Sequence, residues 1–497
     1  MEANMKKILS FVLCVSILLG TLFLLSCAKT DDQKKPDGDT TKEEIYLDNL
    51  DFGGATVKFA LSSAANGNPP SIGYKGFDVD EKSGDIVADA VFDRNATIQE
   101  QLNVNIEIVQ TTGHTEFTST VHPALMAGDD EYDVLGGQQA NDIDLCLEGF
   151  LFDLNKFDGN TNYIDIEGSW WATDYINNYR YKDEIYWLAG PLSLMYAGGA
   201  SCIFVNSRIY DAHFNSTYGN IYELVLKGDW TIDTMADMCA KVYKDNDQSE
   251  TLTDADVFGT RFQSSWSKME LLIGCGLECS SRNADGSINF AITYTNDEYI
   301  NMVQKVYNIF NDTTGMSKDQ VWNFEPFLTG NQLFLFGQLN TLATLREMSD
   351  DFYLIPDPKL DQNQQEYRSA MVDDNQILGI SYTCQNVGAT TATLELMAYL
   401  SSQGITSLYF DEVLKYKYSR DDSTAEMVDL VHDSVYTDFV LIWERWLWDD
   451  HWLRYGGFQP NLTSVVKKAQ DKWLKRFGET LAKLDELAQV EYDSEIK

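Results

Sequence analysis

Positively charged residues are scarce in this sequence. Its 497 residues include 37 Lys and Arg against 77 Asp and Glu, so the formal net charge is −40 at pH 7. The phosphates of nucleic acids and the head groups of anionic lipids repel a chain of this charge. The composition therefore argues against a nucleic-acid partner and against adsorption to an anionic membrane, although solubility alone would explain the charge equally well.

Histidine and catalytic motifs are also scarce. The five histidines, at positions 114, 122, 213, 432 and 451, do not cluster at the spacing of metal ligands. H-E-x-x-H, G-x-S-x-G, a Walker A loop and a Rossmann fingerprint are all missing from the sequence. Nothing singles out a carboxylate pair for glycoside hydrolysis among the 77 acidic residues. We therefore expect a protein that is not an enzyme, and we keep a secreted carbohydrate-active enzyme as an alternative.

The spacings of the cysteines do not indicate a compact disulfide framework. Cys14 and Cys27 lie near the N-terminus, and the other six are Cys146, Cys202, Cys239, Cys275, Cys279 and Cys384. An even number in an exported protein permits disulfides. Most of the six stand in apolar strings, which favours buried free thiols. The segment "CGLEC" (275–279) has no histidine nearby, so a zinc site is not expected.

The N-terminus carries the one long apolar run, residues 8–25, preceded by Lys6 and Lys7. This arrangement is typical of an export signal. The junction "LLSC" resembles a bacterial lipobox, with Leu24, Ser26 and then Cys27. It predicts that residues 1–26 are a lipoprotein signal peptide and that Cys27 receives diacylglycerol and a fatty acid such as palmitate. An uncleaved anchor helix and a plain secretory signal are the alternatives.

Two or more acyl chains hold a protein stably on a membrane. Residues 27–44 are polar and predict a disordered tether. Because residues 1–26 include Lys6, Lys7 and Glu2, their removal would leave a net charge of −41. We expect a folded body that is lipid-anchored on the extracytoplasmic side of the cell membrane.

A β/α pattern begins at Gly53. The segments 55–61, 103–109 and 132–137 read as strands. Apolar residues at helical spacing separate them, and a helix is expected over 141–151. The helix around Phe117, Val121 and Leu125 should be kinked or shortened by Pro123. Such alternation predicts an α/β fold with a parallel sheet.

The apolar segment 184–210 interrupts this alternation of strands and helices. It is predicted to be an extended segment in which the chain crosses from one lobe to another. Hinges are expected near 190–199 and 376–381. Thr231 should cap a helix within 228–243. The segment 331–348 is predicted to form a strand, a glycine turn and a helix. The segment 375–381 is predicted to be a strand that returns to the first lobe. The domains expected are 45–190 (lobe 1), 191–375 (lobe 2), 376–418 (return to lobe 1) and 419–497 (C-terminal helices, mainly lobe 2).

From these residues the chain resembles the family 1 extracellular solute-binding proteins, the maltose-binding-protein-like lipoproteins of ABC importers. The resemblance covers about 45–495 and rests on ordered segments such as "GDIVADAVFDRNATIQEQLNVNIEIV", "DEIYWLAGPLSLMYAGGASCIFVN", "GDWTIDTMADM" and "FLTGNQLFLFGQL". It implies a type II two-lobe fold whose hinged cleft closes over a small solute, usually a mono- or oligosaccharide, and an importer permease as partner. A ligand sensor for a signalling partner is a further alternative.

Candidate ligand-binding residues follow the strands, because open α/β sheets bind ligands beyond the carboxyl ends of their strands. These residues are Gln138, Gln139, Asp142, Gln263, Trp266, Gln338, Asn340 and Arg346. The resemblance implies that the loops after 132–137 and after "LFLF" face the ligand. Gly199 departs from it, because maltose-binding relatives have a polar contact on that crossing strand.

Tryptophan and tyrosine supply faces on which sugars stack. Candidates are Trp170, Trp171, Trp187, Trp322 and the segment 443–455, although most tryptophans should be core. Trp230 stands just before a helix cap and is expected to act as a hydrophobic staple.

A calcium loop is a weaker hypothesis. Asp245, Asp247, Ser249 and Asp256 stand at positions 1, 3, 5 and 12 of such a loop. Glu250 occupies the position that needs glycine, so a solvated acidic loop without metal is the preferred interpretation. We therefore expect no cofactor.

Overall fold

The computed structural model describes residues 45–490 except 46, 48, 64–75, 78, 80, 113, 158–160, 250, 346–347, 372–374, 410–421, 448–449 and 451–457. The predictions for the signal peptide, Cys27, the tether and Arg346 lie outside the described residues. In the part of the chain that the structure describes, none of the helices combines the length and the apolar character needed to cross a membrane.

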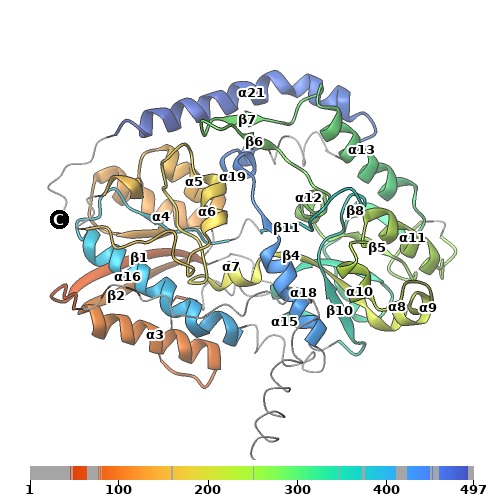
Figure 1. Ribbon diagram of the computed structural model, residues 1–497, viewed down its shortest axis with the longest axis horizontal. Helices are drawn as coiled ribbons and strands as arrows, with labels where there is room; N and C mark the ends of the chain where they lie inside the picture. Colours follow the sequence, from red (N-terminus) through yellow and green to blue (C-terminus); the bar gives the residue numbers. More distant parts are fainter. Residues whose placement is uncertain are drawn as a thin grey trace, which may run out of the picture. The chain divides into compact units, whose positions relative to one another are not determined.

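The first lobe is built on a four-stranded sheet in the order β12-β3-β1-β2. Figure 1 labels its strands β1 and β2. Its strands are β1 (Ala55–Ser63), β2 (Val104–Thr112), β3 (Val134–Gly136) and β12 (Gly379–Ile380). β1 pairs in parallel with β2 and β3, and the return strand β12 pairs antiparallel with β3. The predicted parallel sheet is thus present, and a segment more than 240 residues downstream completes its edge.

Helix α3 (Ile86–Leu102) shows why the sequence pattern was informative. Asp85 caps the helix by accepting hydrogen bonds from the backbone N–H groups of Val87 and Ala88, and the apolar residues at helical spacing are buried. Helix α4 (His114–Ala127), by contrast, continues through Pro123, so of the two predicted effects, a kink or a shortening, the shortening did not occur. Its apolar face packs against β1 and β2, and this burial offsets the backbone hydrogen bond that proline cannot make.

The second lobe contains a sheet in the order β10-β4-β9 and the parallel pair β5-β8. These strands are β4 (Ser201–Asn206), β5 (Thr260–Phe262), β8 (Met316–Gln320), β9 (Phe334–Gln338) and β10 (Phe352–Ile355). A parallel bridge between Phe258 and Gln332 places β5 beside β9. Gly337 lies within β9 and pairs with Cys202, so the predicted glycine turn was wrong. A Cβ at Gly337 would lie 2.8 Å from the Thr341 hydroxyl, which indicates that glycine serves close packing here.

The remaining elements cover the two sheets and join them. They are α5 (Gln139–Leu147), η1 (Leu154–Lys156), α6 (Thr173–Tyr179), α7 (Leu194–Gly198), α8 (Ser207–His213), α9 (Asn215–Tyr218), α10 (Ile221–Leu226), α11 (Ile232–Val242), α12 (Ser265–Gly274), β6 (Ser280–Arg282), β7 (Ile288–Phe290), α13 (Asp297–Asp312), α14 (Glu325–Leu328), η2 (Leu339–Thr341), α15 (Leu342–Leu345), β11 (Ser369–Ala370), α16 (Val387–Leu400), η3 (Ser401–Ile405), α18 (Asp422–Asp433), β13 (Val435–Tyr436), α19 (Phe439–Trp443), α20 (Arg445–Leu447) and α21 (Leu462–Leu487). Thr231 caps α11 as predicted.

The chain passes between the two sheets along two neighbouring segments. Antiparallel bridges join Leu188 to Leu378 and Ala200 to Met371. The first crossing was predicted to be extended throughout. The structure differs, because helix α7 interrupts it. Leu194 and Ala197 of α7 are buried with Val87 and Val91 of α3, and this apolar cluster accounts for the helical turn.

The C-terminal helices contact elements of both lobes. α18 packs against β10, whereas α19 contacts α5, α6 and β6. The long helix α21 contacts α5, next to the first sheet, and α13, next to the second (Figure 1).

All six cysteines outside the N-terminal segment are buried free thiols, in agreement with the interpretation favoured by the sequence. Trp230 is fully buried, and its indole N–H donates to the Pro356 carbonyl (2.9 Å), so it is a core residue.

Candidate functional site

Buried polar residues gather at one edge of the first sheet. Because β1, β2 and β3 are parallel, their carboxyl ends meet at this edge, and β12 begins there. The Gln376 side-chain amide donates to the Ser62 carbonyl (2.6 Å), and Gln138 and Gln376 form an antiparallel bridge. The Gln139 backbone N–H donates to the Asn375 carbonyl (3.2 Å). The predicted residues Gln138 and Gln139 therefore lie at this edge, together with Asn375 and Gln376, which the sequence analysis missed.

Asp142 is the most deeply buried of the predicted residues at this edge. Its side chain is fully buried and accepts a hydrogen bond from the Gly137 backbone N–H (2.8 Å). Burial raises the pKa of this carboxyl well above its ordinary value. A Cβ at Gly137 would come within 2.3 Å of the Asp142 carboxylate, so the pair sets the turn between β3 and α5.

Two tyrosines that the sequence analysis missed extend this edge. The Tyr175 hydroxyl donates to the Gln139 side-chain oxygen (2.5 Å). The Tyr175 ring lies 5.7 Å from the Tyr196 ring of α7, which in turn lies 5.5 Å from the His432 ring of α18. An aromatic row therefore runs from the first sheet past the crossing segment to a C-terminal helix. Two features of the sequence could have indicated these tyrosines: Tyr175 lies in the aromatic segment "GSWWATDYINN", and Tyr196 lies in the predicted crossing segment 184–210.

The corresponding edge of the second sheet carries four more predicted residues. Gln263 directly follows β5, Trp266 lies in the first turn of α12, Gln338 ends β9 and Asn340 follows in η2. The Gln338 side-chain amide donates to the buried carboxylate of Glu270 on α12. The Gln263 side-chain oxygen accepts from the Asn323 backbone N–H (3.2 Å). The structure thus places Gln263, Gln338 and Asn340 at the carboxyl ends of parallel strands, as predicted.

The crossing segment brings these two edges together. The Leu339 backbone N–H donates to the Ala200 carbonyl (3.0 Å), which joins the end of β9 to the crossing. At Gly198 of α7, a Cβ would lie 3.2 Å from the Asn340 Cβ and 2.7 Å from the Tyr409 hydroxyl. Helix α7, which packs on α3 of the first lobe, therefore touches the candidate residue Asn340 of the second lobe.

Several buried polar atoms at these edges have no hydrogen-bond partner among the described residues. They are both amide atoms of Asn375, the side-chain oxygens of Gln376 and Asn340, the Ser193 hydroxyl and the side-chain nitrogen of Gln263. All five side chains are more than nine-tenths buried. Leaving such an atom unpaired costs about 1–3 kcal/mol. Donors and acceptors are both present, which suits a ligand that carries hydroxyl groups.

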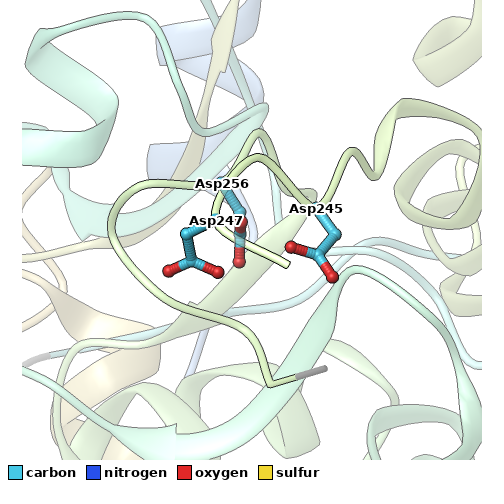
Figure 2. Close-up of side chains that lie close together, drawn as sticks. All are labelled: Asp245, Asp247 and Asp256. Carbon is cyan, nitrogen blue, oxygen red and sulfur yellow. The ribbon is translucent and has the colours of Figure 1, made fainter. Parts of the chain in front are cut away.

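The candidate calcium loop brings three carboxylates together (Figure 2). One oxygen from each of Asp245, Asp247 and Asp256 lies within 4.8 Å of the others, a spacing that a hard cation could bridge. Groups of the loop donate hydrogen bonds to these carboxylates: Asp256 accepts from the backbone N–H groups of Asn246 and Thr253, and Asp247 from the Thr253 hydroxyl (2.7 Å). The Ser249 hydroxyl instead donates to the Thr251 carbonyl (2.8 Å).

A cavity of about 860 Å³ lies elsewhere in the second lobe, between the segment 275–281 that follows α12, helix α13 and the segment 360–368. Its lining includes Glu278, Glu298, Lys305 and Arg368. None of the predicted ligand-binding residues that the structure describes lines it.

Comparison with known proteins establishes the fold. No protein-family model matches this sequence, and no curated protein sequence matches it. A cyclo/maltodextrin-binding protein complexed with maltotetraose has a TM-score of 0.53 at 12% identity, over 89% of this chain and 100% of that chain. A maltose-bound MalE protein of T. maritima has a TM-score of 0.52 at 13% identity, over 84% and 100%.

An ABC substrate-binding protein from Listeria monocytogenes, in complex with cycloalternan, has a TM-score of 0.51 at 12% identity, over 86% of this chain and 99% of that chain. At these identities the likeness is one of fold. The predicted two-lobe α/β fold of the maltose-binding-protein-like solute-binding proteins is confirmed.

Proposed function

We propose that this chain, which has the fold of the maltose-binding-protein-like solute-binding proteins, is itself such a protein. It captures a small solute, which we propose to be a mono- or oligosaccharide, and delivers it to an ABC importer. Lipid attached to Cys27 holds it on the extracytoplasmic side of the cell membrane.

The cluster of unpartnered buried polar atoms at the two sheet edges carries this proposal. Asn375 contributes an acceptor and a donor from the first edge, and Asn340 an acceptor from the second. A hydroxyl both donates and accepts, so a sugar that contacts both edges would satisfy these amides at once. A ligand held from both sides favours the closed arrangement of the lobes, because only that arrangement offers both sets of contacts.

The similar structures support a sugar as the ligand, since maltose, maltotetraose and cycloalternan are bound in them. Micromolar binding would correspond to about −8 kcal/mol. The sequence supports membrane attachment through the lipobox-like "LLSC" and the polar residues that follow it.

A thermal-shift screen of sugars, with peptides as controls, tests the proposal on the purified chain without residues 1–26. We expect at least one sugar to raise the melting temperature and no peptide to do so. Asn375→Ala and Gln139→Ala should each weaken binding of that sugar by about 1–3 kcal/mol, because each removes a hydrogen-bonding partner from a buried site. Met126→Ala, which changes a side chain that is 65% exposed on α4, is the matched control.

Two measurements separate the alternatives. Conversion of the bound sugar to a product by the purified chain would indicate an enzyme. Unchanged uptake of the sugar by cells that lack the chain, together with loss of a transcriptional response to it, would indicate a sensor.

For the loop with Asp245, Asp247 and Asp256 we propose a solvated acidic loop without a resident metal, since the loop's own groups bond its carboxylates. The melting temperature should then be the same in calcium and in EDTA. A calcium-dependent increase that Asp247→Asn abolishes would instead assign a cation to the loop.

A further inference from the structure

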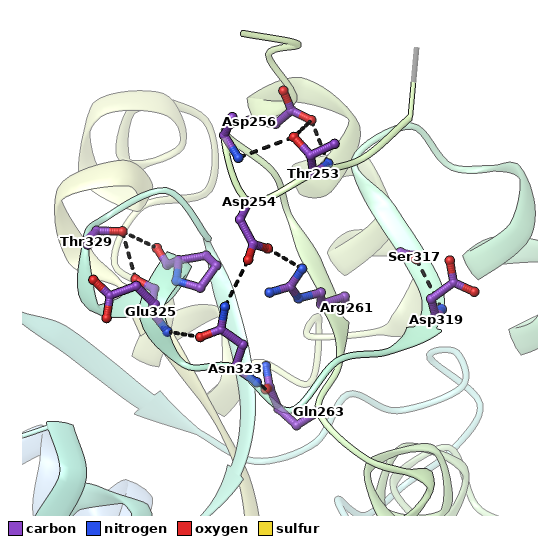
Figure 3. Close-up of polar contacts among 12 residues, drawn as sticks. Thr253, Asp254, Asp256, Arg261, Gln263, Ser317, Asp319, Asn323, Glu325 and Thr329 are labelled. Carbon is purple, nitrogen blue, oxygen red and sulfur yellow. Dashed lines mark hydrogen bonds and ion pairs between the residues drawn. The ribbon is translucent and has the colours of Figure 1, made fainter. Parts of the chain in front are cut away.

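One buried cation of the second lobe has no charged partner among the described residues. Within the part of the chain that the structure describes, Arg94, Arg261 and Lys359 are buried basic residues, each 4% exposed. Arg94 donates a hydrogen bond to the Ser401 hydroxyl (2.9 Å). Arg261 forms an ion pair with Asp254 at 2.5 Å (Figure 3). The Lys359 ammonium, by contrast, forms neither a hydrogen bond nor an ion pair with any residue that the structure describes.

The nearest aromatic ring does not replace such a partner. Burying a charge costs free energy unless an opposite charge or several hydrogen bonds replace the water that it loses. The Lys359 Nζ atom lies 5.3 Å from the centre of the Tyr367 ring, which gives a cation–π contact but no hydrogen-bond acceptor. The Tyr367 hydroxyl is already used, because it donates to the Val225 carbonyl (2.9 Å). The three N–H donors of the ammonium therefore remain for another molecule.

Lys359 lines a pocket that leaves room for this molecule. The pocket has a volume of about 500 Å³ and lies between the end of α10, the turn at 228–229, the segment 359–367 and α18. A Cβ at Gly228, whose φ is +75°, would lie 2.9 Å from the Lys359 Nζ. Beyond the glycine's chain neighbours, that position has no other described residue within 4 Å. The missing side chain at Gly228 therefore leaves the ammonium open on this side.

The other charges of the pocket limit the charge of its occupant. Lys227 is already paired with Glu223 at 3.0 Å. Asp229 also lines the pocket and accepts a hydrogen bond from the Gln362 amide (3.1 Å), and Glu366 is exposed at its edge. These two carboxylates repel a dianion more strongly than a monoanion. A single unpaired ammonium therefore matches one negative charge better than the two of sulfate or phosphate.

The larger cavity of about 860 Å³ shares part of its lining with this pocket but differs in its charges. Its two cations already have carboxylate partners: Lys305 binds Asp233 (2.8 Å) and Arg368 binds Glu278 (2.9 Å). The unbalanced charge thus belongs to the smaller pocket. None of the predicted ligand-binding residues that the structure describes lines it.

We propose that this pocket binds a small monocarboxylate, whose oxygens accept hydrogen bonds from the Lys359 ammonium. Tyr367 and the aliphatic side chains of Leu226 and Leu430 also line the pocket and contact the short apolar part of such a ligand. The site lies apart from the proposed sugar site and does not rest on the proposed function. Its occupant stabilises the folded chain, because the pocket exists only in the folded state.

Calorimetric titration and thermal denaturation of the chain without residues 1–26 test this site. The probes are sodium acetate, propionate and lactate, with sodium chloride and sodium sulfate at equal ionic strength as control salts. Lys359→Met removes the charge at similar length, and Gly228→Ala places a methyl group against the ammonium. Lys475→Met is the matched control, since that side chain is 78% exposed on α21.

We expect at least one monocarboxylate to bind the wild type and to raise its melting temperature above that in chloride. Lys359→Met should weaken this binding roughly 10- to 100-fold, because it removes the charged donor. Gly228→Ala should also weaken it, and Lys475→Met should bind as wild type. Without a carboxylate, Lys359→Met should be at least as stable as wild type, because an unpaired buried charge has been removed.

Four results would overturn the site. The first is equal binding by wild type and Lys359→Met, and the second is no effect of any carboxylate beyond that of chloride. The third is a ligand-free Lys359→Met that is less stable than wild type, which would show that the folded chain, with its bound water, already satisfies the ammonium. The fourth is tighter binding of sulfate through Lys359, which would exclude a monocarboxylate. Failure of sugar binding alone would overturn the proposed function and leave this site standing.

Discussion

At the residue scale, a buried carboxylate stands out. Glu395 of α16 is 1% exposed and accepts hydrogen bonds from the indole N–H groups of Trp170 and Trp171, each at 2.8 Å. These tryptophans precede Ala172, whose backbone N–H donates to the Ala189 carbonyl (2.9 Å). A Cβ at Gly190 would lie 3.2 Å from the Ala172 nitrogen and the Trp170 carbonyl oxygen. Glu395 therefore secures the point at which the chain leaves the first lobe.

Glu395 should make stability depend on pH. Burial raises the pKa of this carboxyl from 4.5 to about 7, although the two indole hydrogen bonds act in the opposite direction. The folded chain therefore holds the proton more tightly than the unfolded chain, and the free energy of unfolding falls as the pH rises from about 4.5 to 7. We expect Glu395→Gln to remove up to about 3 kcal/mol of this dependence.

Denaturant unfolding of wild type and Glu395→Gln from pH 4.5 to 8 measures this effect. Asp357 and Glu444, whose pKa values burial also raises to about 7, are present in both proteins and cancel in the difference. Parallel pH profiles for the two proteins would contradict the assignment.

At the scale of single elements, α7 links the lobes through a position without a side chain. A Cβ at Gly198 would lie 2.7 Å from the Tyr409 hydroxyl and 3.2 Å from the Asn340 Cβ. Gly198→Ala should therefore destabilise the chain by about 1–3 kcal/mol, as overpacking does, and weaken sugar binding by displacing Asn340. Thermal denaturation and a binding isotherm measure the two effects.

The control for this substitution is Gly478→Ala in α21, where nothing lies within 4 Å of the added methyl group. Alanine is the better helix former, so this variant should be more stable than wild type by about 0.5–1 kcal/mol. Loss of stability and affinity in both variants would show that the effect is not specific to α7.

At the scale of the whole molecule, the two crossing segments predict a hinge. They lie between the bridges Leu188–Leu378 and Ala200–Met371. In the predicted second hinge, 376–381, Gln376 bridges Gln138, Leu378 bridges Leu188 and Gly379 pairs with Leu135 of β3. Bound sugar should close the lobes and reduce the radius of gyration.

Small-angle scattering with and without a saturating sugar measures this closure. A sugar that does not shift the melting temperature serves as the control. Superimposable curves with and without the bound sugar would mean that binding does not move the lobes.

Membrane attachment is also a property of the whole chain. We expect Cys27→Ser to release the protein from the membrane fraction or to leave it unprocessed, because the acylated thiol would be lost. Cell fractionation and intact mass spectrometry measure both results. A wild-type mass that shows cleavage at another residue and no acyl group would contradict lipidation at Cys27.

The sequence alone was sufficient for features that depend on neighbours in the chain. Apolar residues at helical spacing between the first two strands predicted α3, Thr231 predicted the start of α11, and the β/α alternation predicted the parallel sheet that the structure contains. The loops that follow parallel strands then located Gln138, Gln139 and Gln338, because the carboxyl ends of such strands share one edge.

Tertiary packing decided the rest. Pro123 stays within a helix and Gly337 within a strand because burial against other elements outweighs their local preferences. Asn375, Tyr175 and Tyr196 join the candidate site through contacts between distant segments, and Asp142 accepts a hydrogen bond from the Gly137 backbone N–H in the turn that follows β3. Such contacts arise only when segments far apart in sequence fold together, so no local spacing encodes them.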